Sequence, residues 1–204
     1  MSGLSRNFCR RFQILLPMPR FDLAQIDKSW TLFLDRDGVI NYEVPGTYVR
    51  NWGEFIFYPK AVENIAFFNT RFQHLFLATN QRGISKGLMT LDDLHDIHMN
   101  LLKAVEKGNG KIERIYFCTD AEESSPCRKP NPGMAFQAFR EFPEINLEKS
   151  VMVGNNLSDM YFGKNAGMKT IFLKTTSPDI ILPHASADLS FDNLDAFARA
   201  LKKS

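Results

Sequence analysis

Short apolar runs recur along the chain, and each of them ends in polar residues. A continuous apolar run is typical of a strand that is buried on both faces of a sheet. We assign strands to residues 31–34, 75–78, 114–118, 151–153 and 170–173, with a last short strand near Leu189. Between the runs, apolar residues recur at helical spacing. These segments predict helices that begin at Pro59, follow Thr90 as an N-cap, and cover residues 134–142, 158–166 and 194–201.

The order of these elements predicts the fold class. Strands and helices alternate from about residue 29 onward, and this alternation favours a parallel sheet with helices on both faces. The expected fold is a doubly wound, Rossmann-like α/β domain over residues 29–204 with a mostly parallel sheet. Residues 1–28 precede the pattern and are assigned to an N-terminal extension.

The N-terminal extension shares some features with a targeting signal. Arg6, Arg10 and Arg11 precede a short apolar stretch, as they would in a signal peptide. Pro17 and Pro19 interrupt the stretch, and no cleavage pattern of small residues follows. We therefore expect a surface arm. The longest apolar stretches hold about five residues, which is far short of a bilayer span.

Composition narrows the class of partner. The 204 residues include 25 Lys and Arg against 23 Asp and Glu, a net charge of +2. This balance gives no electrostatic reason to expect nucleic acid or an anionic membrane as a partner. The three cysteines, Cys9, Cys118 and Cys127, are too few for a disulfide framework. They predict reduced thiols and a cytoplasmic protein.

Polar side chains follow the predicted strands and the loop before one of the helices. They are Asp35 and Asp37, Thr79 and Asn80, Arg128 and Lys129, and Asn155 and Asp159. In open α/β sheets, ligands bind outside the carboxyl ends of the strands. These residues therefore form the candidate site.

Asp35 and Asp37 carry the most specific chemistry. In extended backbone, residues two positions apart point the same way. Alone, two such aspartates also fit ordinary turn residues. The spacing suits a nucleophile, Asp35, that attacks phosphorus, and a partner, Asp37, that protonates the leaving oxygen and later deprotonates water. Carboxylates beside a phosphate repel it, so this chemistry needs Mg²⁺ and a fixed cation, here Lys129, with Thr79 as a candidate for binding phosphate oxygens.

Four segments resemble, in order, the motifs of the haloacid dehalogenase (HAD) phosphatase superfamily. They are residues 33–40 (FLDRDGVI), 78–84 (ATNQRGI), 127–134 (CRKPNPGM) and 153–160 (VGNNLSDM). The residues within these motifs are similar to those of one branch, the D,D-heptose 1,7-bisphosphate phosphatases and their histidinol-phosphatase relatives. The resemblance covers about residues 30–200. It implies a HAD-like fold without a large cap domain.

The resemblance also implies roles for individual residues. Asp35 would be the aspartyl-phosphate nucleophile and Asp37 the general acid and base. Thr79 and Lys129 would bind the transferring phosphate, with Asn80 beside them.

Substrate specificity in this branch comes from loops. The resemblance implies that Arg128 reaches the sugar or a second phosphate. We expect further substrate contacts from the loop of residues 43–51, notably from Tyr48 and Arg50.

The implied metal site departs from the family pattern at one position. Mg²⁺ would be held by the Asp35 carboxylate, the Asp37 carbonyl and residue 155. The fourth motif normally begins Gly-Asp, whereas here it reads Gly154-Asn155. An amide oxygen can coordinate a hard cation, but one negative charge is lost. We expect weaker Mg²⁺ binding, slow turnover or a non-catalytic relative. Asp159 would lie next to the direct ligands without binding the ion itself, or would bind it through a water molecule.

A second metal is not expected. Relatives of this branch often hold structural Zn²⁺ with three cysteines and a histidine. Cys118 and Cys127 match two of these positions, but Asp120 and Ser125 occupy the others. Two thiolates do not complete a closed tetrahedral zinc site, so we expect two reduced thiols instead.

Three functions remain open at this point. The first is a Mg²⁺-dependent phosphatase for a small phosphorylated metabolite, with a heptose bisphosphate as the first candidate substrate and histidinol phosphate as the second. The second is a phosphate-binding relative without turnover, which Asn155 favours. The third is a receiver-like domain phosphorylated on aspartate, which the segment containing Arg128 and Lys129 does not suit. We also expect a monomer, and His95 and His98 on a helix surface.

Overall fold

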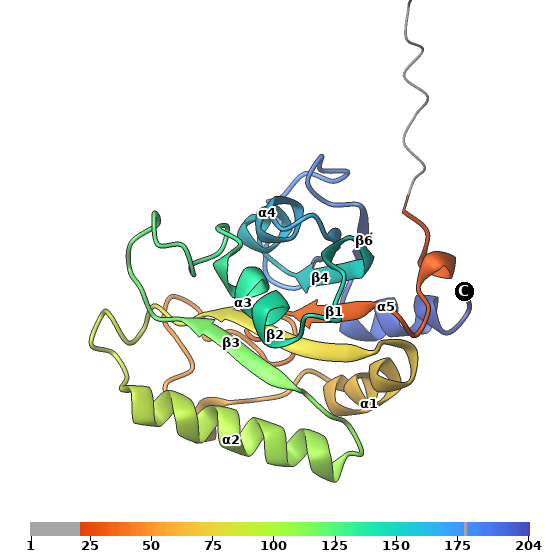
Figure 1. Ribbon diagram of the computed structural model, residues 1–204. Coiled ribbons are helices and arrows are strands. Elements are labelled where there is room, and N and C mark those ends of the chain that lie inside the picture. Colours follow the sequence, from red (N-terminus) through yellow and green to blue (C-terminus); the bar gives the residue numbers. More distant parts are fainter. Residues whose placement is uncertain (1–20, 178) are drawn as a thin grey trace, which may run out of the picture.

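A parallel sheet forms the middle layer of the protein, with the strand order β3-β2-β1-β4-β5-β6 (Figure 1). The computed structural model describes residues 21–177 and 179–204. The strands are β1 (Thr31–Leu34), β2 (His74–Asn80), β3 (Arg114–Cys118), β4 (Ser150–Gly154), β5 (Lys169–Leu173) and β6 (Leu189–Phe191). The helices are α1 (Ala61–Arg71), α2 (Leu91–Lys107), α3 (Gly133–Glu141), α4 (Leu157–Asn165) and α5 (Leu194–Leu201). The predicted doubly wound α/β fold is confirmed.

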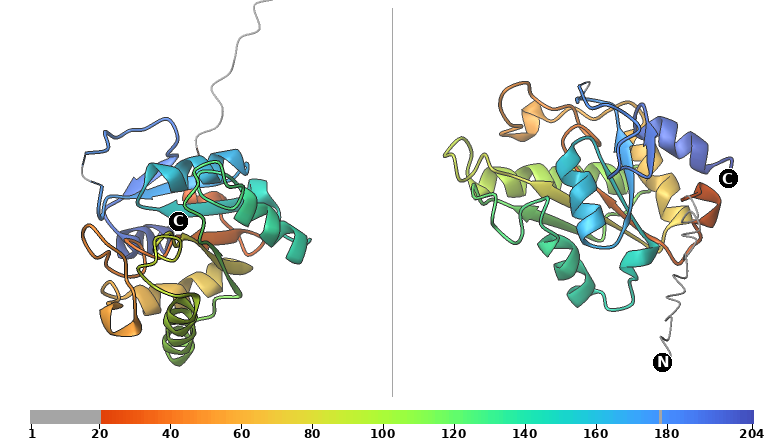
Figure 2. Two further views of the ribbon diagram at one scale, coloured as in Figure 1. Left: turned by 90° about the vertical axis from the view of Figure 1, so that its left-hand side faces the viewer. Right: turned by 90° about the horizontal axis from the view of Figure 1, so that it is seen from above.

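Helices cover both faces of the sheet. Helices α1, α2 and α5 lie on one face, and α3 and α4 lie on the other (Figures 1 and 2). Successive strand residues face opposite layers. In β1, Leu32 and Leu34 join the core beneath α1, α2 and α5, while Phe33 joins the core beneath α3 and α4. As predicted, the described part of the chain contains no large cap domain beside these layers.

Element boundaries follow from local interactions. The predicted N-cap of α2 is confirmed, because Thr90 and Asp93 form a reciprocal capping box. Helix α1 begins at Ala61 rather than at Pro59, since Lys60 has a left-handed φ of 61° that ordinary helix does not allow. Strand β2 continues through Thr79 and Asn80, which pair with β3. These two residues therefore belong to the strand itself rather than to the loop after it.

Successive strands are added on one side of β1 as far as β3 and on its other side from β4 onward. This change of side positions the site. Strand β1 pairs with β2 on one side and with β4 on the other, with Leu34 level with Leu77 and Val153. The Asp35 N–H extends the ladder and donates to the Val153 carbonyl at 2.9 Å. A doubly wound sheet opens a crevice at such a point. The carboxyl-end edge of the sheet faces the viewer in the left panel of Figure 2.

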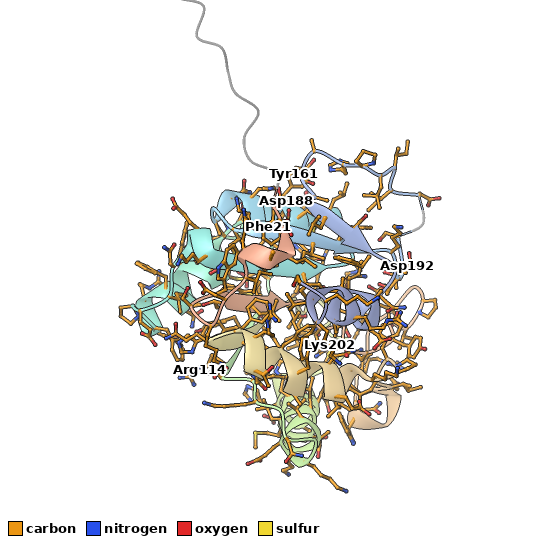
Figure 3. The ribbon with its side chains drawn as sticks, turned by 90° about the vertical axis from the view of Figure 1, so that its right-hand side faces the viewer. Phe21, Arg114, Tyr161, Asp188, Asp192 and Lys202 are labelled. Atoms are coloured by element: carbon orange, nitrogen blue, oxygen red, sulfur yellow. A yellow bond between two sulfur atoms is a disulfide. The ribbon has the colours of Figure 1, made fainter. Side chains whose placement is uncertain are left out.

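The N-terminal part of the described chain packs against the opposite edge (Figure 3). Phe21, Leu23 and Ile26 are buried in the core, and Phe21 stacks on Trp30 with ring centroids 5.8 Å apart. The domain boundary after residue 28 stays a prediction, and the arginine-rich arm predicted before it lies outside the described residues. Among the described residues, no helix is long and apolar enough to cross a membrane.

Candidate active site

A cavity of about 240 Å³ opens at the carboxyl ends of β1, β2 and β4. Most of the residues that the sequence singles out line it: Asp35, Asp37, Tyr48, Thr79, Asn80, Arg128, Lys129, Asn155 and Asp159. Arg50 does not line the cavity, and its guanidinium instead pairs with Glu54 at 2.9 Å. The structure therefore brings the segments with the four motifs together and leaves Arg50 outside.

Lys129 lies at the centre of the site. Its Nζ contacts Asp35 Oδ1 at 2.9 Å and Asp159 Oδ1 at 2.6 Å, and donates to the Ala78 carbonyl at 2.7 Å. The Lys129 side chain is 1% exposed. Three segments far apart in the chain thus converge on one buried ammonium group, and this cation offsets the charge of two carboxylates.

Two neighbours hold Lys129 and Asp159 in place. Asn80 Oδ1 accepts from the Lys129 N–H at 3.0 Å, and Asn80 Nδ2 donates to the Lys129 carbonyl at 3.1 Å. Asp159 accepts from the N–H of Asn156, the N-cap of α4, at 3.0 Å. The Lys129 backbone is therefore fixed by Asn80 at the end of β2. The Asp159 carboxylate is fixed by the backbone at the start of α4.

Burial and charge move the pKa values of the site in different directions. Burial raises the pKa of Asp35 to about 7, although the nearby Lys129 ammonium lowers it. Burial also lowers the pKa of Lys129, but Asp159 and Asp35 outweigh that effect, so the pKa of Lys129 is raised. For Asp37, burial is outweighed by Arg36, Asn41 and Gln81, and its pKa is lowered. Perturbed values of this kind are typical of functional sites.

Asp37 is fixed by a buried polar network. Arg36, whose side chain is fully buried, places Nη2 2.9 Å from Asp37 Oδ2. Asn41 and Gln81 donate to Asp37 at 2.8 and 2.9 Å. Arg36 Nη1 lies 3.2 Å from His98 Nε2. Burial and the Arg36 charge lower the pKa of His98 to about 3, so this ring is neutral and its Nε2 accepts from Arg36.

The expectation that His98 lies on the helix surface is therefore wrong. His98 is buried on α2, because the buried Arg36 charge needs an acceptor on that side. The sequence does not single out Arg36 or Gln81 either. The sequence feature that could have identified them is their position inside the first and second motifs. A polar residue directly beside a catalytic candidate at a strand end is expected to bind that candidate's side chain or one near it.

Thr79 presents a buried hydroxyl at the same edge. Its Oγ1 accepts from Gln81 Nε2 at 2.9 Å, which leaves the hydroxyl hydrogen available as a donor. A phosphate oxygen is an acceptor, so the hydroxyl is suited to bind one.

The oxygen donors at this edge fit Mg²⁺. Asn155 is 2% exposed and lines the cavity together with Asp35 and Asp37. Its Oδ1 is buried and has no hydrogen-bond partner among the described residues. An unpartnered buried amide oxygen is costly, and Mg²⁺ prefers carboxylate and carbonyl oxygens. The orphaned oxygen and the acid pair therefore match the chemistry of this ion.

The loop after β3 corrects one prediction. Cys118 and Cys127 form a disulfide rather than two reduced thiols. Asp120 and Ser125, at the other two positions of the implied zinc site, lie beside them, with Ser125 Oγ donating to Asp120 Oδ2. The strand end and the loop return bring the two sulfurs together, a proximity that sequence spacing does not reveal.

Comparisons with known proteins agree with this geometry. A family model described as HAD-hydrolase-like matches residues 126–196. A D-glycero-alpha-D-manno-heptose-1,7-bisphosphate 7-phosphatase from Mycobacterium bovis is 34% identical over 174 residues, 85% of this chain and 92% of that protein. A D-glycero-beta-D-manno-heptose-1,7-bisphosphate 7-phosphatase from Helicobacter pylori is 40% identical over 162 residues, 78% of this chain and 91% of that protein.

A solved structure shares the fold. The D,D-heptose 1,7-bisphosphate phosphatase from B. bronchiseptica, complexed with magnesium and phosphate, has a TM-score of 0.75 and 28% identity, and the match covers 85% of this chain and 98% of that chain. Fold, site and relatives together define a HAD-like phosphatase. The chain belongs to the D-glycero-D-manno-heptose-1,7-bisphosphate phosphatase family. The predicted resemblance is confirmed, and the receiver-like alternative is excluded.

Proposed function

We propose that this protein is a Mg²⁺-dependent phosphatase that removes one phosphate from D-glycero-D-manno-heptose 1,7-bisphosphate. The observation that carries the proposal is the contact of the buried Lys129 ammonium with Asp35, at 2.9 Å, inside the cavity. A carboxylate nucleophile needs such a fixed cation when it approaches a negatively charged phosphate. The names of the relatives from M. bovis and H. pylori support the substrate.

The residues support a reaction in two steps. In the first, an Asp35 oxygen attacks phosphorus, the bond to the ester oxygen breaks, and Asp37 gives that oxygen a proton. In the second, Asp37 takes a proton from water, the water oxygen attacks phosphorus, and the bond to Asp35 breaks to release phosphate. Lys129 and Thr79 hold the phosphoryl oxygens throughout.

Mg²⁺ would be held by the Asp35 carboxylate, the Asp37 carbonyl and Asn155 Oδ1, with Asp159 behind them. When bound, the ion neutralises charge on the phosphoryl oxygens and the nucleophile. The magnesium and phosphate in the B. bronchiseptica structure support this cofactor.

Arg128 is the candidate for recognising the second phosphate or the sugar. It lines the cavity, and its Nη1 has no hydrogen-bond partner among the described residues. A guanidinium with available donors is suited to a phosphate. Tyr48 lines the cavity too and would contact the sugar.

A second candidate function rests on Asn155. The loss of a charged ligand favours a weakly active or non-catalytic phosphate-binding relative, because one negative charge is missing from the metal site. We further propose that the protein is a cytoplasmic monomer that acts on a small metabolite, with no nucleic-acid or membrane partner. The near-balanced charge supports the absence of nucleic-acid and membrane partners, and sedimentation of the purified protein tests the monomer.

A substrate panel with Mg²⁺ tests the proposed function. The panel holds the α and β anomers of the heptose bisphosphate and histidinol phosphate, and phosphate release is measured over time. We expect turnover of a heptose bisphosphate, with one phosphate released per molecule, and a preference for one anomer. Bisphosphate binding without any turnover would instead establish the phosphate-binding relative, and preferential turnover of histidinol phosphate would reassign the substrate.

A further inference from the structure

Asn155 is held by its amide nitrogen, and its oxygen is left over. Nδ2 donates to Glu43 Oε1 at 2.7 Å and also contacts the Thr176 hydroxyl. Oδ1 is buried without a partner among the described residues, and Asn155 lines the cavity with Asp35 and Asp37. The amide thus presents an unused acceptor at the edge where the acid pair lies.

Glu43 determines which way the amide points. A carboxylate at neutral pH only accepts hydrogen bonds, so it binds the NH₂ end of an asparagine and never the oxygen. With Glu43 and Thr176 on the nitrogen side, the oxygen must face the other way. Glu43 comes from the loop after β1, 112 positions away in sequence, so this orientation is a tertiary effect.

Glu43 also lies close to the backbone that would supply a metal ligand. A Cβ at Gly38 would lie 2.6 Å from Glu43 Oε1 and 2.1 Å from Asn155 Nδ2. Gly38 follows Asp37, whose carbonyl is a candidate ligand, and has a φ of 78°. The backbone at Asp37 and Gly38 is therefore packed closely against both the Glu43 carboxylate and the Asn155 amide.

We propose that Glu43 compensates for the carboxylate that residue 155 lacks. It orients Asn155 so that Oδ1 is available to Mg²⁺, and it returns one negative charge to the immediate surroundings of the ion. Glu43 is thus a positioning residue that acts through Asn155. This inference rests on the proposed function, since it concerns the same magnesium site.

Binding of Mg²⁺ without substrate tests the inference independently of turnover. Calorimetric titration compares the natural protein with Glu43→Gln, which keeps an acceptor but removes the charge, and Glu43→Ala, which removes both. Glu54→Gln is the matched control, because Glu54 pairs with Arg50 outside the cavity. We expect Mg²⁺ affinity to fall by about tenfold in Glu43→Gln and further in Glu43→Ala, as when the outer partners of metal ligands are removed. Glu54→Gln should leave the affinity unchanged.

The Asn155→Asp background separates compensation from a general structural role. With a carboxylate restored at residue 155, Glu43→Gln should cost far less Mg²⁺ affinity than it costs beside Asn155. An equal loss in both backgrounds, or an unchanged affinity in Glu43→Gln, would overturn the inference while leaving the proposed function intact. If the natural protein bound no Mg²⁺ at all, the magnesium part of the proposed function would fail and the inference with it.

Discussion

Asp35 and Asp37 are two positions apart, yet their surroundings move their pKa values in opposite directions. Burial raises the pKa of Asp35 to about 7, whereas Arg36 and two amide donors outweigh burial and lower the pKa of Asp37. In the metal-free protein near neutral pH, Asp37 is therefore ionised, so in the proposed reaction it must take up its proton once the phosphate is bound, whereas Asp35 holds its proton more tightly than an ordinary carboxyl. Metal binding at Asp35 competes with that proton.

The raised pKa of Asp35 makes a prediction for the stability of the metal-free protein. A group whose pKa is raised on folding stabilises the fold fully below its unfolded value, here 3.8, and loses that contribution as the pH rises through about 7. Relative to Asp35→Asn, the natural protein should lose up to about 1.4 kcal/mol of unfolding free energy per pH unit in this window. Urea denaturation with a chelator present measures the difference, and parallel pH profiles for the two proteins would contradict it.

Gly38 is the residue at which backbone conformation and packing act together. Its φ of 78° and the close approach of Asn155 and Glu43 both disfavour a side chain. Gly46 is a matched control, with a φ of 72° and nothing within 4 Å of an added Cβ. Gly46→Ala should cost about 1–2 kcal/mol of stability for the left-handed backbone alone.

Gly38→Ala should cost more than Gly46→Ala and should also weaken Mg²⁺ binding, because the added methyl group displaces Asn155 or Glu43. Urea denaturation and Mg²⁺ titration of both variants provide the comparison. Equal destabilisation of the two, with unchanged metal affinity, would show that Gly38 matters only for its φ.

At the residue scale, sequence identifies the groups that share a periodic position or a motif. Asp35 follows β1, Thr79 lies at the end of β2 and Lys129 precedes α3, so their convergence could be predicted. Glu43 lies in a loop without periodicity, and only the fold shows that it meets Asn155. His98 was expected on the surface because its hydrogen-bond donor, the buried Arg36, lies 62 positions away in the sequence.

Among the elements, the loop between β3 and α3 departs furthest from expectation. The Cys118–Cys127 disulfide ties the end of β3 to a position inside this loop, nine residues further on, and Arg128 and Lys129 follow Cys127 directly. Disulfides in cytoplasmic proteins are uncommon and often respond to redox state. The bond thus ties the order of this loop to the redox conditions around the protein.

Reduction should therefore destabilise the protein. A closed loop of about ten residues contributes roughly 2–3 kcal/mol of unfolding free energy through the entropy of the unfolded chain. Urea denaturation with and without dithiothreitol measures this contribution, and the Cys118→Ser/Cys127→Ser double variant should not respond to the reductant. A natural protein with the same midpoint under both conditions would contradict the prediction.

Across the whole molecule, the order of elements was predictable and the walls of the cavity were not. Alternating strands and helices, with right-handed crossovers, allow few topologies, so the parallel sheet and its crevice follow from pattern alone. The side walls come from loops: the loop of residues 43–51 was expected to contact substrate, but the resemblance singled out Tyr48 and Arg50, whereas Val44 and Thr47 line the cavity and Arg50 does not. The topology brings Asp35, Lys129 and Asp159 together, and this convergence is the basis of the proposed phosphatase.

In the proposed mechanism, Asp35 carries the phosphoryl group during turnover. The most direct test uses the substrate that the panel identifies, labelled with ³²P on the phosphate that is released. The reaction is started with Mg²⁺ and quenched with acid within the first turnover. We predict protein-bound label on the peptide that contains Asp35, and neither label nor turnover in Asp35→Asn, whose rate should fall by at least roughly a thousandfold. Sustained turnover in Asp35→Asn, or turnover of the natural protein without any covalent label, would contradict the account.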